Sequence, residues 1–202
     1  MSIQYTPVSS SHLARLEEAL RAFEPQVPRL EAWGRRAAQV LIAGGRLLAC
    51  GNGGSAEQAQ HLTAELVGRY EDERPPLAAV PLTHDMAAVT AIGNDYGAAQ
   101  VFARQVRAHG RPGDLLVCLS TSGRSANVVA AAQAAAAIGM TAWALTGPGP
   151  SPLTDACADA ITVDAPVTST VQEVHLAAIH IMCAAVDAAV RDGLGVVLET
   201  AR

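Results

Sequence analysis

The spacing of apolar residues divides the chain into a helical N-terminal part and a longer alternating part. From Leu13 to Phe23, apolar side chains recur every three or four positions, which predicts an amphipathic helix. Pro25 and Pro28 interrupt this pattern, because proline removes a backbone donor and clashes with the preceding turn. A second helical run follows and ends at a glycine pair. We therefore expect an N-terminal helical region, interrupted once, over residues 10–43.

Beyond this region, short apolar runs alternate with helical patterns. The apolar runs predict five strands, at residues 46–52, 77–82, 114–120, 140–147 and 159–165. Helical patterns lie at residues 55–70, 84–109, 125–139 and 168–193. Ser55 is the expected N-cap of the first of these helices, and Gly93 and Gly97 are expected to break the second. Residues 148–158 predict a turn with at most one turn of helix.

This alternation is typical of an α/β fold. Short, strongly apolar strands separated by helices indicate a parallel sheet that helices cover on both faces. We expect a single domain over residues 1–202, with N-terminal helices at 1–43 and an α/β core at 46–192. Sheets of this kind bind ligands beyond the carboxyl ends of their strands, so candidate chemistry is expected in the loops that follow the strands.

Composition and charge narrow the class of protein. Half of the 202 residues are hydrophobic, but no apolar run reaches the roughly 20 residues of a membrane span. The N-terminus lacks the basic start and apolar block of a secretory signal, so we expect a soluble, cytoplasmic protein. A net charge of −5 without a basic run disfavours nucleic-acid binding. Aromatic residues, at 3%, leave few platforms for stacking bases.

All fourteen basic residues are arginine, and the absence of lysine excludes several classes of enzyme. Schiff-base chemistry requires a lysine amine, so PLP-dependent enzymes and lysine-dependent aldolases are excluded. P-loop kinases are excluded because their phosphate-binding motif contains lysine. The four cysteines form no CxxC pair and are expected to be buried thiols, not metal ligands or redox groups.

Two loops between a predicted strand and a predicted helix could hold a phosphate group. The first, CGNGGS at residues 50–55, has three glycines that let backbone amides approach a ligand at the start of a helix. Its spacing is not GxGxxG, which disfavours NAD binding. A tight strand-to-helix turn would explain the same glycines, so this loop alone leaves binding and structure open.

The second loop, STSGRS, is richer in hydroxyl groups. It carries Ser120, Thr121, Ser122 and Ser125, whereas capping the following helix needs only one of them. Hydroxyls and backbone amides can bind phosphate without lysine. The excess of hydroxyls favours phosphate binding over simple capping. Arg124 could assist, or it could be a solvated surface charge.

Residues suited to acid–base chemistry occur on two predicted helices. His61 and Glu65 are four residues apart, so they project from the same side of their helix. Gln172, His175 and His180 could share one broad face of the last helix. Together, these side chains could act as acid and base or hold a divalent metal such as zinc. The alternatives are a plain surface pair at His61 and Glu65 and a structural role for His175.

Motifs spread over residues 35–190 resemble the sugar isomerase (SIS) superfamily and, within it, the phosphoheptose isomerase family. In chain order they are CGNGGS, AQHLTAEL followed by GRY, RP, GNDYG, GDLLVCLSTSGRSANV, GM, LTG and QEVHLAAIH. The resemblance implies an SIS domain, a flavodoxin-like three-layer α/β sandwich with a five-stranded parallel sheet. It also implies a homotetramer whose active sites lie between subunits. The implied activity is that of an aldose–ketose isomerase in heptose biosynthesis, which converts sedoheptulose 7-phosphate to a manno-type D-glycero-heptose 7-phosphate through an enediol.

The resemblance also assigns roles to residues. Glu65 and His180 are implied to carry the proton transfers, and a carboxylate and an imidazole suit this chemistry. Zinc, one ion per subunit, is implied at His61, Glu65, Gln172 and His180. The implied substrate contacts come from small and polar residues: Asn52, Gly53, Gly54, Ser55, Asn94, Asp95, Ser120, Thr121, Ser122, Ser125 and Gln172.

One segment departs from the family pattern. The family usually has arginine two residues before Gln172, where this chain has Thr170, preceded by Ser169. We expect this difference to remove a charge from the lip of the active site and to affect the choice of substrate.

Two alternative functions stay open. One is a non-catalytic SIS protein that binds the replication initiator DnaA, although that branch departs from the acid–base pattern that Glu65 and His180 preserve here. The other is an isomerase or sensor of another phosphosugar. The sequence does not distinguish a pathway to lipopolysaccharide, to a surface glycan or to a secondary metabolite.

Overall fold

The computed structural model describes residues 8–200, with side chains described from residue 11 to residue 193. Its centre is a five-stranded sheet with the order β2-β1-β3-β4-β5, in which every neighbouring pair is parallel. The predicted parallel sheet is therefore confirmed. Its strands are β1 (Leu47–Cys50), β2 (Ala79–Pro81), β3 (Leu115–Ser120), β4 (Thr141–Thr146) and β5 (Asp159–Thr162).

Helices connect the strands in the predicted order. Short 3-10 turns, η1 (Glu24–Gln26) and η2 (Ala98–Gln100), interrupt the helical regions at Pro25 and after Gly97. The α-helices are α1 (Val8–Phe23), α2 (Val27–Ile42), α3 (Gly54–Val67), α4 (Met86–Tyr96), α5 (Val101–His109), α6 (Ala126–Ala137), α7 (Pro152–Ala156) and α8 (Thr168–Thr200).

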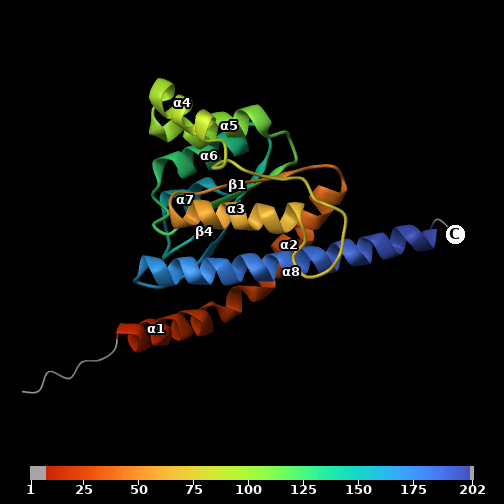
Figure 1. Ribbon diagram of the computed structural model, residues 1–202, viewed down its shortest axis with the longest axis horizontal. Helices are drawn as coiled ribbons and strands as arrows, with labels where there is room; N and C mark the ends of the chain where they lie inside the picture. Colours follow the sequence, from red (N-terminus) through yellow and green to blue (C-terminus); the bar gives the residue numbers. More distant parts are fainter. Residues whose placement is uncertain (1–7, 201–202) are drawn as a thin grey trace, which may run out of the picture.

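The helices form layers on both faces of the sheet (Figure 1). Leu47 and Leu115 point to the layer of α2, α3 and α8, whereas Leu48 and Leu116 point to the layer of α4, α5, α6 and α7. Successive residues of β1 and β3 thus enter opposite layers, as strand geometry requires. Both strands are buried along their whole length. Burial on two faces explains why the sequence shows them as continuous apolar runs.

The sheet has a switch point between β1 and β3. The chain adds β2 on one side of β1 and then β3 on the other. Consequently α3, which follows β1, and α6, which follows β3, pack on opposite faces of the sheet. Their connecting loops begin at the neighbouring carboxyl ends of β1 and β3, the position at which sheets of this order bind ligands.

The structure corrects two details at helix ends. Ser55 is not the N-cap of α3, because the helix begins at Gly54 and Gly53 takes the N-cap position with φ of +55°. Glycine adopts such a backbone angle readily, so the chain enters the helix earlier than a serine cap predicts. Gly93 lies inside α4, and the break occurs only at Gly97, where φ is +84°.

The last helix, α8, runs along one face of the molecule (Figure 1) and continues to Thr200, past its predicted end at residue 193. In length and apolar composition, Thr168–Gly193 would suffice to cross a membrane. Half of that stretch is buried inside the protein, however, and residues from Val174 to Val190 belong to the core. The apolar composition of α8 therefore fits a core helix.

The cysteines are free thiols, as predicted. Cys50 and Cys118 face each other on β1 and β3 with their sulfur atoms 3.9 Å apart, Cys183 is buried in α8, and Cys157 is half-buried. Hydrogen bonds to Cys157 and Cys50, together with burial, raise the pKa of Cys118. Burial raises the pKa of Cys183 to about 12. Both thiols therefore stay protonated and unreactive at neutral pH.

Candidate active site

The predicted acid–base residues meet where α3 packs against α8. His61 Nε2 lies 3.4 Å from a carboxylate oxygen of Glu65 on the same helix and 2.9 Å from His180 Nε2 on α8. All three side chains are half-buried, so a ligand can reach them while the two helices limit their movement. The structure thus brings His180 to the His61–Glu65 pair that helical spacing predicts, although His180 is 119 residues from His61 in the sequence.

Gln172 connects this cluster to the glycine loop. A Cβ atom at Gly54 would lie 2.6 Å from the side-chain nitrogen of Gln172, so glycine at this position lets the Gln172 side chain lie directly against the start of α3. Gln58 Nε2 also donates a hydrogen bond to the backbone carbonyl of Gln172. The predicted ligand Gln172 therefore lies beside the first turn of α3.

The two predicted phosphate loops lie side by side at the switch point. Asn52 in the first loop and Asn127 in the first turn of α6 exchange two side-chain hydrogen bonds, of 2.9 and 2.8 Å. The sequence did not single out Asn127, because its partner is 75 residues away. This amide pair holds the carboxyl-end loops of β1 and β3 together.

The hydroxyl loop leaves the start of α6 without a side-chain cap. Ser120 is buried and its Oγ lies 3.1 Å from Oγ of Ser125. Ser125 occupies the N-cap position of α6, yet its hydroxyl makes no capping hydrogen bond. Ser122, which is exposed, accepts a hydrogen bond from the backbone N–H of Arg124. These hydroxyls are thus arranged around a helix start that none of them caps.

The starts of α3 and α6 lack the side-chain caps that α4 and α7 have, as do those of α2 and α5, which follow 3-10 turns. The Asp85 side chain caps α4, and Ser151 caps α7 with a reciprocal capping box. The N-cap residues of α3 and α6, Gly53 and Ser125, provide no side-chain cap. Amides at an uncapped helix start favour an anion, and here two such starts follow neighbouring strands.

Asn94 and Asp95 are not brought to this cluster. They lie at the end of α4 and are exposed, and the Asn94 side chain donates a 2.9 Å hydrogen bond to Asp95. Helix α4 belongs to the sheet layer opposite α8, as Figure 1 shows. Within one described chain, therefore, this pair and the acid–base residues lie on different sides of the sheet.

The start of α8 differs from expectation at Thr170. Thr170 is only 1% exposed, so the position where the family has arginine is buried here and does not form an exposed lip. Ser169 beside it is exposed. His12 on α1 lies 2.8 Å from the Glu173 carboxylate on α8. His175 is fully buried, and burial lowers its pKa to about 4, which keeps it neutral and supports the structural interpretation.

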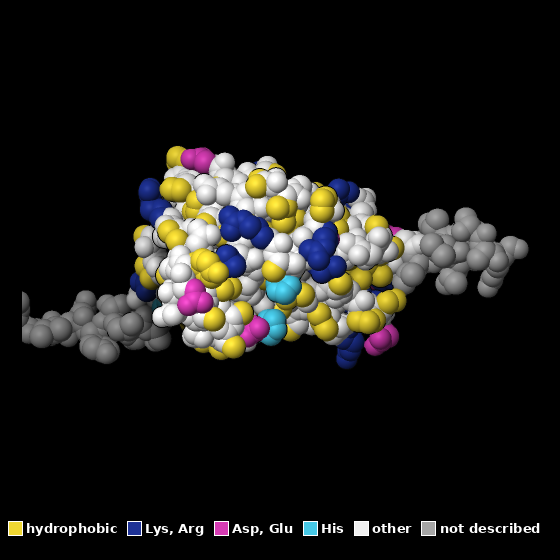
Figure 2. Space-filling view, turned by 90° about the horizontal axis from the view of Figure 1, so that it is seen from above, with side chains coloured by type: hydrophobic (Ala, Val, Ile, Leu, Met, Phe, Trp, Pro, Cys, Tyr) yellow, Lys and Arg dark blue, Asp and Glu magenta, His cyan; other side chains and the backbone are white. Residues whose placement is uncertain are grey.

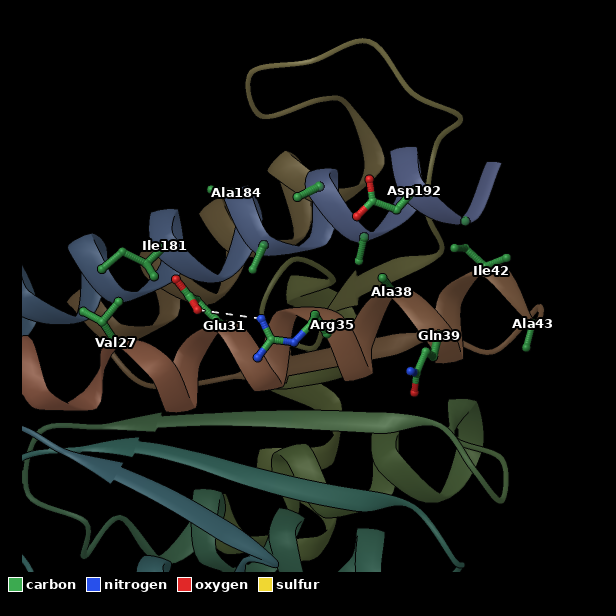
Figure 3. Close-up of a pocket in the computed structure, with 14 residues that line it drawn as sticks. Val27, Glu31, Arg35, Ala38, Gln39, Ile42, Ala43, Ile181, Ala184 and Asp192 are labelled. Carbon is green, nitrogen blue, oxygen red and sulfur yellow. Dashed lines mark ion pairs between the residues drawn. The ribbon is translucent and has the colours of Figure 1, made fainter. Parts of the chain in front are cut away.

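A large groove lies away from the acid–base cluster. It measures about 1020 Å³, runs between α2 and α8, and is lined by no predicted site residue (Figure 3). Its walls are mainly apolar, with Val27 and Ile42 on α2 and Ile181 on α8, although a Glu31–Arg35 pair crosses its floor. This composition fits a protein contact better than a sugar-phosphate site.

The face seen in Figure 2 bears on the expectation that the chain binds no nucleic acid. In the face that Figure 2 shows, arginine side chains are scattered between uncharged atoms and do not gather in one stripe. A duplex-binding surface requires such clustering.

Comparison with known proteins places the chain in a family. The family model of the SIS domain matches residues 11–147. A phosphoheptose isomerase from Streptomyces coelicolor is 57% identical over 187 residues, which cover 93% of this chain and 81% of the relative. The chain belongs to the phosphoheptose isomerase family. A second member, from Thiobacillus denitrificans, is 48% identical and covers 86% of this chain and 90% of its own.

Solved structures of the family confirm the predicted fold. The phosphoheptose isomerase from Francisella tularensis superposes with a TM-score of 0.85 at 35% identity, covering 91% of this chain and 99% of its own. The enzyme from Neisseria gonorrhoeae gives a TM-score of 0.83 at 42% identity, with 89% and 97% covered. The resemblance in the sequence motifs therefore identified the family correctly.

We expect the double substitution Ser120→Ala with Ser122→Ala to weaken sugar-phosphate binding far more than folding, because these hydroxyls exceed what α6 needs. Two lost hydrogen bonds to a charged group, at about 1.5–3 kcal/mol each, predict a rise in Kd of at least about a hundredfold by calorimetry. Thr154→Ala is the matched control, because the Thr154 hydroxyl serves only the capping box of α7. A lower Tm with unchanged Kd in the double variant would assign both serines a structural role.

Proposed function

We propose that the protein is an aldose–ketose isomerase that converts sedoheptulose 7-phosphate to a manno-type D-glycero-heptose 7-phosphate. The observation that carries this proposal is the convergence of Glu65, His61 and His180 beside two uncapped helix starts. One part of the site suits proton transfer, and the other suits a phosphate. Membership of the phosphoheptose isomerase family supports the same activity and substrate.

The reaction assigns a separate task to each group. The phosphate binds at the starts of α3 and α6, among the amides of Gly53 and Gly54 and the hydroxyls of the loop that begins at Ser120. Glu65 removes a proton from C1 of the open ketose and delivers it to C2. His180 serves the two oxygens, donating a proton to the carbonyl and accepting one from the hydroxyl, and assists ring opening. The remaining predicted substrate contacts are Asn52, Ser55, Asn94, Asp95, Thr121, Ser122, Ser125 and Gln172.

Zinc is part of the proposal, held by His61, Glu65, Gln172 and His180. Among the described residues, no three His, Cys, Asp or Glu side chains already form a metal-binding group. Neighbouring ligand atoms of a tetrahedral zinc ion lie about 3.3 Å apart, and the 2.9 and 3.4 Å separations around His61 Nε2 are close to that value. The donor set of two imidazoles, a carboxylate and an amide suits zinc. A bound zinc ion would polarise the carbonyl and the enediolate.

The non-catalytic alternative is less well supported. A protein that only binds a partner has no need of a carboxylate and two imidazoles within hydrogen-bonding distance of one another, yet His61 joins Glu65 to His180 in this way. An isomerase for another phosphosugar would use the same machinery. The choice between substrates therefore needs a direct assay.

The decisive assay incubates the purified protein in D2O with a panel of ketose and aldose phosphates, with and without a chelator, and identifies products by NMR. We expect sedoheptulose 7-phosphate to give an aldose that carries deuterium at C2, because a carboxylate open to water exchanges part of its proton before returning it. Chelation should slow the reaction, and added zinc should restore it. Conversion without deuterium incorporation would exclude Glu65 as a base that exchanges its proton with water. Tight binding of a protein partner without turnover would favour the non-catalytic alternative.

Glu65→Gln is expected to lower kcat by about 10²- to 10⁴-fold, the usual effect of losing a positioned base, while sugar-phosphate affinity stays largely intact. Glu57→Gln is the matched control, because Glu57 is an exposed carboxylate on the same helix. Steady-state kinetics and calorimetry measure the two quantities. Wild-type turnover in Glu65→Gln would remove this residue from the mechanism.

We also propose a cytoplasmic homotetramer with active sites between subunits. Two features support it: the apolar groove between α2 and α8, and the position of Asn94 and Asp95 on the sheet layer opposite the acid–base cluster. A neighbouring subunit could bring this pair to a substrate bound at α8. Light scattering at micromolar concentration is expected to give four times the 20.8 kDa chain mass. A monomeric mass together with full activity would contradict the shared site.

A further inference from the structure

A buried ion pair ties the loop after α3 to α8. Arg74 Nε lies 2.6 Å from Asp187 Oδ1, and the two side chains are only 3% and 4% exposed. Arg74 also donates to the backbone carbonyls of Glu65 and Leu66 in the last turn of α3. The Arg74 guanidinium thus caps the C-terminal end of α3, which carries the proposed base Glu65, and also contacts α8, which carries His180.

Asp187 holds the same loop from the other side. Its second carboxylate oxygen accepts hydrogen bonds from the backbone N–H groups of Glu71 and Asp72, at 3.3 and 3.4 Å. Breaking such a pair leaves an uncompensated buried charge, which is strongly unfavourable. The backbone on either side of Tyr70 is therefore fixed between α3 and α8.

The held loop places Tyr70 against His180. The two rings stack with centroids 5.4 Å apart and planes 29° apart, and the Tyr70 ring also packs against the core. On another side, the His180 ring contacts the ring of His61, at 5.1 Å and 57°. His180 has two rotatable side-chain bonds, and these aromatic neighbours select the rotamer in which its Nε2 meets that of His61.

We infer that Tyr70 is a positioning residue for His180, held in place by the Arg74–Asp187 pair. The effect on rate rests on the proposed isomerase function, whereas the effect on the His180 ring does not. The contribution comes from the ring of Tyr70. Burial, with the nearby Glu71, Cys183, Glu65 and Asp187 adding to it, raises the pKa of the hydroxyl and keeps it uncharged.

The first test observes His180 directly. In protein labelled with ¹³C at histidine Cε1, each of the six histidines gives its own signal. The signal that disappears in His180→Gln is assigned to His180. Stacking under Tyr70 should shift the His180 ring proton upfield in the wild type and in Tyr70→Phe. Tyr70→Met keeps much of the apolar volume but no ring, and should lose this shift; Tyr70→Leu serves if the methionine variant does not fold. An unchanged His180 signal in the non-aromatic variant would overturn the inference.

The second test uses kinetics. Tyr70→Phe should stay within about twofold of wild type, whereas Tyr70→Met should lower kcat about tenfold with little change in KM, because misplacing a catalytic group costs rate. In a double-mutant cycle, Tyr70→Met should cause no further loss in the His180→Gln background. The same tenfold loss there would show a general structural effect and overturn the inference.

Controls separate this inference from the proposed function. Asp72→Asn removes the exposed ion pair with Arg191 from the same loop, two residues after Tyr70, and should leave both kcat and the His180 signal unchanged. If the wild type turns over no sugar phosphate, the proposed function fails, and the His180 signal alone decides on the role of Tyr70. Turnover without the upfield shift would reject the role of Tyr70 and retain the function.

Discussion

The close packing of α3 against α8 is the constraint on which the acid–base chemistry depends. His61 and Glu65 belong to one helix and His180 to the other, so the 2.9 Å separation between His61 and His180 exists only at one relative position of the two helices. Gly54 permits the contact at the start of α3 because it has no side chain to oppose Gln172. At the other end of α3, the Arg74–Asp187 pair ties this helix to α8. A buried charge that must stay paired resists displacement more strongly than apolar packing alone.

In the proposed mechanism, helix α3 also links phosphate binding to proton transfer. Its uncapped N-terminus lies at the switch point, and His61 lies two turns further along, about 10 Å away at 1.5 Å per residue. An extended seven-carbon phosphate can span that distance, with its phosphate at the helix start and its carbonyl carbon near the acid–base residues. The amides and hydroxyls of the two loops replace the lysine that the chain lacks. One rigid element thus sets the distance between the two ends of a substrate.

Much of this arrangement follows from local patterns in the sequence. Strands buried on both faces appear as apolar runs, so all five were predictable, and helical spacing paired His61 with Glu65. The cap at Gly53 was missed because Ser55, two residues later, is of a type that commonly caps helices.

Contacts that join distant segments could not be predicted in this way. Arg74 and Asp187 are 113 residues apart, and Asn52 and Asn127 are 75 apart. Neither pair, nor the stacking of Tyr70 on His180, can be predicted from the periodic spacing of residues along the sequence, because only the tertiary fold brings the partners together. Recognition of the family motifs proposed the site residues, but it could not reveal what holds them in place.

The two faces of α8 give a physical reason for an active site to depend on assembly. His180 points to α3, while the next residue, Ile181, lines the apolar groove beside α2. A second subunit packed in this groove would restrain α8 from outside, on the side that the Arg74–Asp187 pair does not reach. The position of His180 would then be set by a buried charge on one face and by subunit contact on the other. Such an arrangement makes the catalytic geometry a property of the assembled protein as well as of the single chain.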